Sequence, residues 1–166
     1  MNTRKICMVS IVVMLSFVNS LVLQAEEQTS TLQHHASHVF VTPAQLQWQA
    51  GPPSLPPGAS MAVVEGNPKQ AGLFTMRIKL PANYRIPAHW HPADEHVTVI
   101  SGMFNMGAGD VLDTTSGTAL PAGSFALMPA QMHHFAWTSE ETIIQLHGVG
   151  PWQINYINPA DDPRRT

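Results

Sequence analysis

Apolar and polar residues alternate with a period of two along most of the chain. Within residues 73–80, Phe74, Met76 and Ile78 are separated by Thr75 and Arg77, a pattern that predicts a strand with one buried and one exposed face. Similar runs predict strands at 38–41, 61–64, 73–80, 95–100, 124–128, 133–138, 142–147 and 153–157. No long helical period competes with this pattern, so we expect a chain built from strands.

Glycine and proline separate these apolar runs at short intervals. The 166 residues include 14 prolines and 11 glycines, and turn signals occur at 81–83, 101–102, 107–109, 116–117 and 121–123. Many short strands joined by such turns are typical of an all-β sandwich or barrel. The length fits one domain of this kind, so we expect a single all-β domain.

The N-terminal segment has the three parts of a secretory signal peptide. Arg4 and Lys5 precede an apolar run, and Ala25 stands just before two glutamates. We therefore predict a signal peptide at 1–25 and an exported protein, periplasmic or secreted. The apolar stretch 6–23 is also close to the ~18 residues of a membrane span, so a retained anchor is the alternative. The remainder divides into an N-terminal arm and connector at 26–60, a barrel at 61–158 and a polar tail at 159–166.

The charge of the chain excludes some classes of partner. Eight Lys and Arg stand against 11 Asp and Glu, a formal net charge of −3, which leaves no basic surface for a nucleic-acid backbone. We expect no nucleic-acid partner and, after signal cleavage, no membrane contact. Nine histidines are the unusual feature, because imidazoles bind metals and titrate near neutral pH.

Residues 89–95, His-Trp-His-Pro-Ala-Asp-Glu, form a compact group of metal-binding side chains. In an extended strand, His89 and His91 point to the same face, about 6.6 Å apart along the backbone. Pro92 ends that strand, and Glu95 opens the next one, from which its carboxylate can turn back to the same point. Alternation places Asp94 on the opposite face. Two imidazoles and a carboxylate suit a divalent transition metal.

A second histidine pair, His133 and His134, offers a fourth ligand. Neighbouring residues on a strand point to opposite faces, so only one of the two can face the same site as His89. Two histidines close together in a sequence, with no other candidate ligand, are more often hydrogen-bonded core or surface side chains than metal ligands. The carboxylate at Glu95 and the second histidine-bearing strand together favour a metal site.

These residues resemble the two motifs of the cupin family, over roughly residues 71–148. The first motif reads G(x)5HxH(x)3E(x)6G, and the chain has Asn83, His89, His91, Glu95 and Gly102 at these positions. Asn83 replaces the first glycine, and asparagine is a residue that tolerates a positive φ.

The second motif reads G(x)5PxG(x)2H(x)3N, and the chain has Gly123, Pro129, Gln131, His134 and Thr138 at these positions. Gln131 replaces a glycine and Thr138 replaces the asparagine, and neither is a metal ligand in the motif. The spacing of the motif favours His134 over His133 as the fourth ligand.

The cupin resemblance implies a double-stranded β-helix, a small jelly-roll barrel, with one metal ion bound by His89, His91, Glu95 and His134. The ion would be Fe, Mn, Ni, Cu or Zn, whose order of affinities does not decide between them. The resemblance also implies a homodimer. Its commonest chemistry is that of a dioxygenase-like metalloenzyme acting on a small molecule, and an isomerase or decarboxylase of a chelating acid would use the same site. The alternative is a non-catalytic cupin that binds or senses a metal or a small ligand.

Other side chains close to the ligand strands in sequence are candidates to orient a substrate or to move protons. These catalytic candidates are Glu95, Tyr84, Arg85, Gln145 and His147. An apolar pocket lining would suit a small organic molecule, and its candidates are Met76, Ile78, Val97, Val99, Phe125, Leu127 and Trp137. The sequence has no phosphate-binding glycine loop, no Gly-x-Ser-x-Gly and no His-Glu-x-x-His, which excludes nucleotide hydrolysis, serine hydrolysis and zincin chemistry.

Overall fold

The computed structural model describes residues 38–165. The predicted signal peptide at 1–25 and residues 26–37 of the predicted arm and connector lie outside these residues. Among the described residues, no helix is long and apolar enough to span a membrane.

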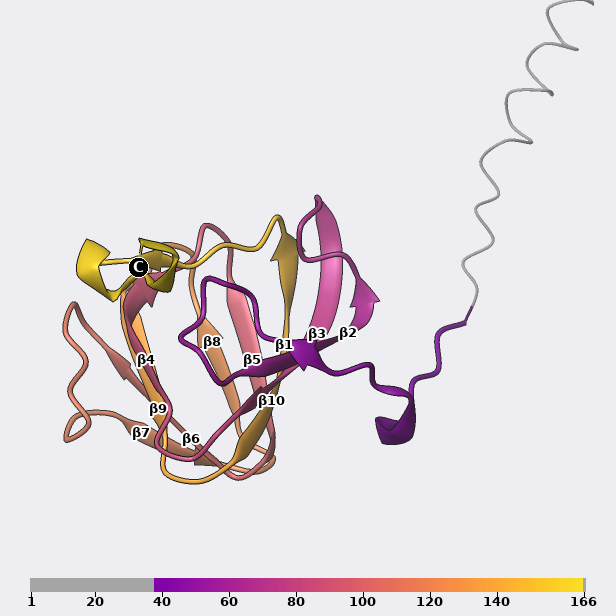
Figure 1. Ribbon diagram of the computed structural model, residues 1–166, viewed down its shortest axis with the longest axis horizontal. Coiled ribbons are helices and arrows are strands. Elements are labelled where there is room, and N and C mark those ends of the chain that lie inside the picture. Colours follow the sequence, from indigo (N-terminus) through magenta and orange to yellow (C-terminus); the bar gives the residue numbers. More distant parts are fainter. Residues whose placement is uncertain (1–37, 166) are drawn as a thin grey trace, which may run out of the picture. The chain divides into compact units, whose positions relative to one another are not determined.

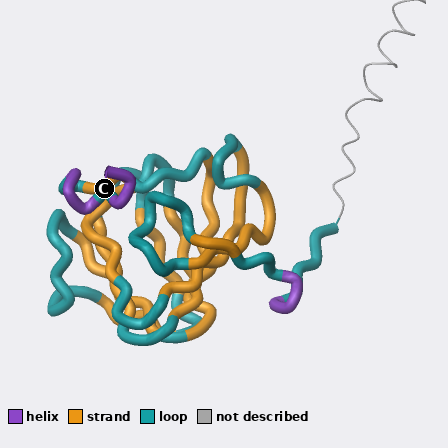
Figure 2. Tube along the Cα trace, viewed as in Figure 1, coloured by secondary structure: helices purple, strands orange, loops and turns teal. Residues whose placement is uncertain are grey.

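Two antiparallel sheets form the domain (Figure 1). The six-stranded sheet has, in spatial order, β1 (Gln49–Ala50), β2 (Ser60–Gly66), β3 (Gly72–Leu80), β10 (Thr142–Gly150), β5 (Glu95–Ser101) and β8 (Phe125–Met128). The five-stranded sheet has β11 (Asn155–Tyr156), β4 (Arg85–Trp90), β9 (His134–Thr138), β6 (Met103–Ala108) and β7 (Thr118–Pro121). Three short 3-10 turns complete the described part: η2 (Pro43–Gln45), η3 (Pro159–Asp161) and η4 (Pro163–Arg165). The all-β expectation is confirmed, and strands and loops account for almost the whole domain (Figure 2).

The hydrophobic core lies between the two sheets and takes side chains from both. Met76 and Ile78 enter it from β3, and Phe104 and Met106 enter it from β6. The alternation predicted for 73–80 is confirmed, since the odd-numbered positions within this range are all more exposed than the even-numbered ones. Each fully buried large apolar side chain stabilises the fold by roughly 1.5–3 kcal/mol relative to an exposed one.

Several strands differ from the prediction. Residues 38–41 are exposed coil rather than a strand. Strands β1, β4, β6 and β7 are additional; Pro87 interrupts the residue pattern of β4, and Gly107 lies in β6. The register of β4 against β9 shifts between Ile86 and His89, so that the consecutive residues Ala88 and His89 are both buried. This irregularity hides β4 from a period-two search.

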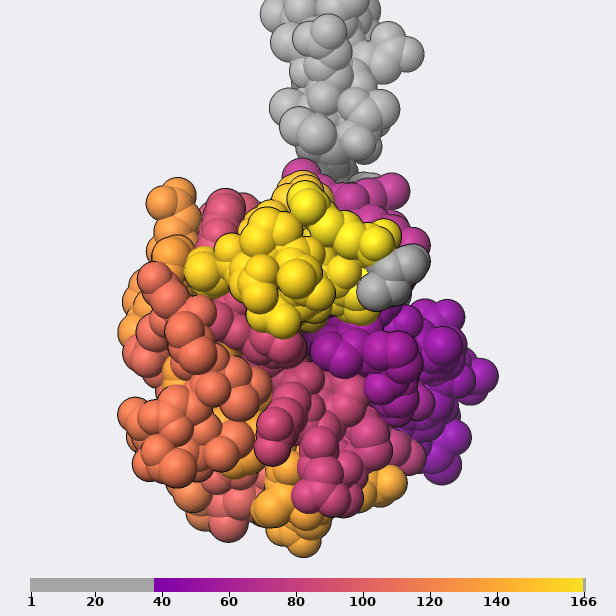
Figure 3. Space-filling view, turned by 60° about the vertical axis from the view of Figure 1, so that its left-hand side comes forward, coloured from indigo at the N-terminus to yellow at the C-terminus, as the bar shows by residue number. Residues whose placement is uncertain are grey.

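The connector before β2 is part of the domain rather than a free linker. Leu55 is buried in the core, the Tyr84 hydroxyl donates a hydrogen bond to the Pro56 carbonyl, and the Tyr156 hydroxyl donates to the Ser54 carbonyl at 2.7 Å. Figure 3 shows the C-terminal segment, in yellow, beside this connector, in purple. Arg164 fixes the C-terminal segment further, because its Nη2 donates to the Ile154 carbonyl at 3.0 Å.

Two residues at glycine positions of the cupin motifs have a left-handed backbone. Asn83 has φ 61° and Gln131 has φ 64°, as the expected tolerance of asparagine allows. Gly102, which is retained, has φ 79°, and a Cβ there would lie 2.4 Å from the Glu141 carbonyl oxygen. The Gln131 N–H donates to the His91 carbonyl at 2.8 Å, so this turn holds the segment that carries His91.

The Gln131→Gly variant should therefore be more stable than the natural protein. A left-handed non-glycine residue costs roughly 1–2 kcal/mol, part of which the extra freedom of unfolded glycine offsets. We expect a gain of about 1 kcal/mol in the free energy of unfolding, or about 3 °C in Tm, in calorimetry. Asn83→Gly should gain less, and Gln131→Ala should gain nothing. A lower Tm for Gln131→Gly would show that the glutamine side chain, rather than the backbone, determines this turn.

Candidate metal centre

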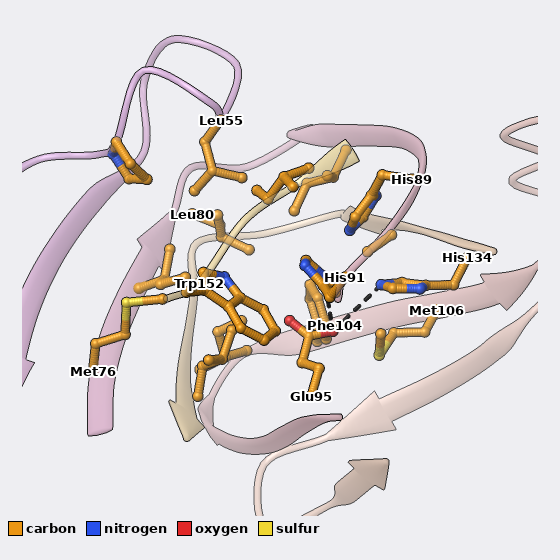
Figure 4. A pocket seen from close by; sticks show the side chains of 17 residues that line it. Leu55, Met76, Leu80, His89, His91, Glu95, Phe104, Met106, His134 and Trp152 are labelled. Carbon is orange, nitrogen blue, oxygen red and sulfur yellow. Dashed lines mark ion pairs between the residues drawn. The ribbon is translucent and has the colours of Figure 1, made fainter. Parts of the chain in front are cut away.

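The ends of three strands bring four polar side chains together in the barrel. His89 lies near the end of β4, His91 follows it, Glu95 opens β5 and His134 opens β9. His89 and His134 are cross-strand partners. All four are buried, with exposed fractions of 1–6%. Figure 4 shows the three imidazoles and the carboxylate converging on one point.

The three imidazoles are close enough to share one ion. Each of His89, His91 and His134 offers a ring nitrogen within 4.8 Å of the other two. The Oε2 atom of Glu95 lies 3.6 Å from Nε2 of His91 and 3.3 Å from Nε2 of His134. The carboxylate therefore faces the same point as the imidazoles.

Backbone carbonyls determine which nitrogen of each imidazole faces the centre. The Nδ1 atoms of His89 and His91 lie 2.7 Å from the carbonyl oxygens of Pro87 and Gln153, and Nδ1 of His134 lies 2.9 Å from that of Met132. A carbonyl only accepts hydrogen bonds, so each Nδ1 carries a proton. In a neutral imidazole this leaves Nε2 with a free lone pair, the form that binds metals.

Two of these lone pairs are buried beside a negatively charged group. Nε2 of His91 and Nε2 of His134 have no hydrogen-bond partner although both are buried, and Oε2 of Glu95 lies within 3.6 Å of each. Acceptors that face each other without water are costly unless a cation lies between them. The three buried histidines could therefore hold a metal ion, and the carboxylate beside them adds an oxygen ligand of suitable hardness.

The electrostatics favour a neutral imidazole at His89 and a charged carboxylate at Glu95. Burial, with the neighbouring His134 and His91, lowers the pKa of His89 to about 3. Burial alone would raise the pKa of Glu95, but the imidazoles of His91 and His134 hold that pKa well below its usual range. Both groups are therefore in the ligating form at neutral pH.

A small, apolar cavity opens beside the four side chains. Its volume is about 30 Å³, room for one or two water-sized molecules at roughly 10–15 Å³ each. Apart from the four candidate ligands, none of its lining residues is titratable. The remaining lining comes from both sheets, the connector and the segment after β10: Pro52, Leu55, Met76, Ile78, Leu80, Ile86, Phe104, Met106, Ala136, Ile144, Leu146, Trp152 and Ile154.

Comparison with known proteins identifies the family of the chain. Residues 36–153 match the family model of the ChrR cupin-like domain, and this is most of the chain. The chain belongs to the ChrR cupin-like family. The two cupin motifs noted in the sequence lie within the matched residues, so the resemblance is confirmed.

Solved structures with the same fold include several other cupins. An acetylacetone dioxygenase from Acinetobacter johnsonii has a TM-score of 0.56 at 16% identity, covering 76% of this chain and 80% of its own. The polyketide cyclase RemF from Streptomyces resistomycificus has 0.58 at 12% identity, covering 76% and 90%. An RmlC-like cupin from Shewanella frigidimarina has 0.53 at 17% identity, covering 68% and 91%. These likenesses establish the double-stranded β-helix fold. No curated protein matches the sequence.

The two neighbouring histidines of this cupin take different positions. His134 points into the barrel, whereas His133 is exposed and its Nδ1 lies 2.6 Å from Oδ1 of Asp110. Asp94, the neighbour of Glu95, also turns away, and its Oδ1 accepts a hydrogen bond from the Ala130 N–H at 2.8 Å. The structure thus brings together the four residues that the motifs select.

The four other catalytic candidates do not line the cavity of this cupin. Tyr84 is buried but its hydroxyl donates to the connector, and burial raises its pKa. Arg85 is exposed on β4. Gln145 accepts a hydrogen bond from Nε of Arg77 at 3.2 Å, and the His147 ring stacks on His96 at 4.7 Å between centroids.

The physical reason for this difference is strand alternation. On β10, Ile144 and Leu146 face the cavity, so the odd-numbered positions 145 and 147 face outward. Met76 and Ile78 line the cavity as expected, and Val97 and Val99 lie in the core without lining it. The other three residues expected to line the pocket lie on the outer side of the sheets and do not reach the cavity: Phe125, Leu127 and Trp137.

Trp152 belongs to the site, and the sequence gives no signal for it. Its indole stacks on the His91 ring with centroids 4.0 Å apart and planes at 22°. The two residues are distant in sequence and meet only because the segment after β10 folds back over β4. Pro52 and Leu55 reach the cavity in the same way from the connector.

Acidification should destabilise the ion-free protein. Below pH 6.5 the unfolded chain binds a proton at residue 89 that the folded chain, with a His89 pKa of about 3, does not. The free energy of unfolding then falls by about 1.4 kcal/mol per pH unit for this group. The lowered pKa of His147, caused by burial and by His96, acts in the same direction.

Urea unfolding of the chelator-treated protein measures this effect. We expect the free energy of unfolding to be roughly 2 kcal/mol lower at pH 5 than at pH 7. His133→Ala, which removes an exposed histidine, should show the same fall, and His89→Gln a smaller one. Equal or greater stability at pH 5 would contradict a buried, neutral His89.

Proposed function

We propose that this cupin binds one divalent transition metal through His89, His91, Glu95 and His134 and uses it to transform a small, oxygen-chelating molecule. The observation that carries the proposal is the orientation of the imidazoles. Three carbonyl-bound Nδ1 atoms direct three Nε2 lone pairs at one point, beside a buried carboxylate. Such preorganised ligands are characteristic of metal sites.

Each part of the site has a role in this proposal. A divalent ion would supply Lewis acidity to the chelating oxygens of the bound molecule and, as Fe, Mn, Ni or Cu, an electron-transfer centre for O2. The apolar side chains exclude water from the cavity and strengthen its electrostatic interactions. Glu95 carries the only carboxylate among the lining residues, so it is the group available to accept a proton from the bound molecule.

The class of substrate follows from the lining. A small apolar cavity with one cluster of polar atoms suits an organic molecule whose oxygens reach the cluster. Among the solved structures of the same fold, one is an acetylacetone dioxygenase and another a polyketide cyclase. A 1,3-dicarbonyl compound such as acetylacetone chelates a metal through its enolate, so a dioxygenase-like reaction on this class is the first chemistry to examine. Isomerisation or decarboxylation of a chelating acid is the second.

The lining also favours one alternative. Apart from the four candidate ligands, the described lining offers no acid or base. The same lining would therefore serve a cupin that binds or senses a metal or small ligand without turnover. The family to which the chain belongs is described by its ChrR-like cupin domain and not by a reaction.

Oxygen uptake separates these possibilities. The protein loaded in turn with Fe, Mn, Ni, Cu or Zn is mixed with acetylacetone or with a chelating acid, and O2 consumption, product formation and binding are followed. A dioxygenase consumes O2 with loss of substrate, and an isomerase or decarboxylase converts substrate without O2. A sensor binds without turnover. His134→Ala should abolish all three signals, and signals that persist in this variant would contradict the proposed site.

We also propose that the protein forms a homodimer and that it is exported by a signal peptide. Sedimentation of the purified protein tests the first, and the N-terminal sequence of the protein recovered from its host tests cleavage after Ala25.

A further inference from the structure

The cavity beside the candidate ligands is too small for a whole substrate. Its 30 Å³ accommodates the head of a molecule but not a chain or ring attached to it. If the proposed function is right, any larger part of the substrate must lie elsewhere.

A second, larger pocket adjoins this cavity. It has a volume of about 510 Å³, within the range of roughly 300–1,000 Å³ typical of small-molecule sites. Its walls are the connector at 49–54, β2 and the turn at 67–69 between β2 and β3. Met61, Val63, Met76 and Trp152 give it an apolar wall, and the polar side chains of Gln49, Ser54, Asn67 and Lys69 complete the lining. We refer to it as the outer pocket.

The two spaces share three walls: Pro52, Met76 and Trp152. In Figure 4, Trp152 lies between Met76 and the ligand cluster. Its indole covers His91, and its backbone N–H donates to the Pro68 carbonyl at 2.7 Å. The backbone of Trp152 is thus fixed to the wall of the outer pocket, while its side chain separates that pocket from the cluster. Met76 has a flexible side chain that can adapt to a ligand.

We propose that the outer pocket binds the apolar body of the substrate, and that the oxygen-bearing head reaches His91 and its neighbouring ligands past Trp152. This inference rests on the proposed function and adds the size and polarity of the substrate. The substrate is then an amphipathic molecule with a chelating head and an apolar tail, and Trp152 is a positioning residue at the junction.

A third space is the competing location. It has a volume of about 330 Å³ and is lined by residues of β6, β7 and β8, the turn at 116–117 and Met132, but it shares only Met106 with the cavity. Its Met132 carbonyl lies 2.9 Å from Nδ1 of His134, but none of its lining residues stacks on a candidate ligand ring as Trp152 stacks on His91. Thr118, on β7, lines this third space and provides a variant that tests it.

Binding of a homologous series measures the contribution of the tail. The probes are 2,4-pentanedione and 2,4-diketones with progressively longer unbranched alkyl chains, titrated into the metal-loaded protein and followed by the absorption of the bound enolate. If the tail is buried, each added methylene should tighten the Kd by about fourfold until the outer pocket is filled. The readout is the ratio of the Kd of 2,4-pentanedione to that of the longest diketone.

Three tryptophan substitutions locate the tail. Val63→Trp fills the outer pocket and should reduce this ratio at least about tenfold. Val149→Trp is the matched control, because Val149 is an exposed valine on the outer face of β10 that lines neither space; its ratio should equal that of the natural protein. A flat series, an unchanged ratio in Val63→Trp, or a loss in Thr118→Trp alone would overturn the inference. Failure of every diketone to bind would overturn the proposed function and this inference with it.

The role of Trp152 has its own readout. Removal of its side chain should open a path for a colorimetric chelator, so metal extraction from Trp152→Ala should be at least about tenfold faster than from the natural protein, and Trp152→Phe should lie between them. Trp137→Ala, which removes a partly buried indole that lines neither space, is the control. Equal extraction rates in Trp152→Ala and Trp137→Ala would contradict a barrier at Trp152.

Discussion

Replacing His134 by alanine is expected to lower the affinity for a divalent transition metal by more than about a hundredfold. Loss of a residue that only orients a ligand costs about 10–100-fold in affinity, and loss of a ligand costs more. His134 has no other polar role toward the cavity, because its Nδ1 is bound to the Met132 carbonyl and its Nε2 faces Glu95.

The adjacent histidine provides a matched control for this prediction. His133 differs from His134 by one position, is exposed, and pairs only with Asp110 at the surface, an interaction of small energy. Competitive titration against a chromogenic chelator should give His133→Ala an affinity within about threefold of the natural protein. Equal affinities in the two variants, or loss in His133→Ala alone, would show that the wrong face of β9 has been assigned to the site.

Removal of the metal is expected to lower Tm by roughly 10 °C. An ion that binds only the folded chain adds about 4 kcal/mol to the free energy of unfolding at a free concentration a thousand times its Kd, and a domain of this size gains a few degrees per kcal/mol. The ion also relieves the contact between the lone pairs of His91 and His134 and the carboxylate of Glu95.

Calorimetry with and without a chelator measures this shift. Zn²⁺ or Ni²⁺ should restore Tm, whereas Mg²⁺ and Ca²⁺ should not, because hard cations prefer oxygen ligands to imidazole. The shift should disappear in His134→Ala and persist in His133→Ala. An equal shift with Mg²⁺, or with both variants, would indicate nonspecific binding at exposed groups.

The fold could be predicted from sequence where alternation is uninterrupted. Strand β3 and its buried positions follow directly from residues 73–80, because a two-sided strand repeats its pattern at every second residue. Strand β4 could not be found in this way, because Pro87 and the shifted register against β9 place consecutive residues, Ala88 and His89, inside the barrel. The exposed segment 38–41 shows the opposite error, because its apolar residues predict a strand and the structure has coil there.

The candidate ligands could be predicted because the motifs combine residue type with spacing, and the choice of His134 over His133 followed from that spacing. The surroundings of the ligands could not be predicted. Nearness in sequence to a ligand strand suggested Gln145 and His147, yet the alternation of β10 turns both outward. Trp152 reaches His91 only through the tertiary fold, so no local pattern marks it.

X-ray absorption of the metal-loaded protein tests the central claim most directly. The protein is purified without a histidine tag and loaded with one equivalent of Zn²⁺ or Ni²⁺, and the scattering from imidazole rings is counted. The account predicts three imidazoles and at least one oxygen ligand, at about 2.0–2.2 Å from Zn²⁺, with one imidazole fewer in His134→Ala. Failure to bind one equivalent, or a spectrum with fewer than three imidazoles in the natural protein, would contradict it.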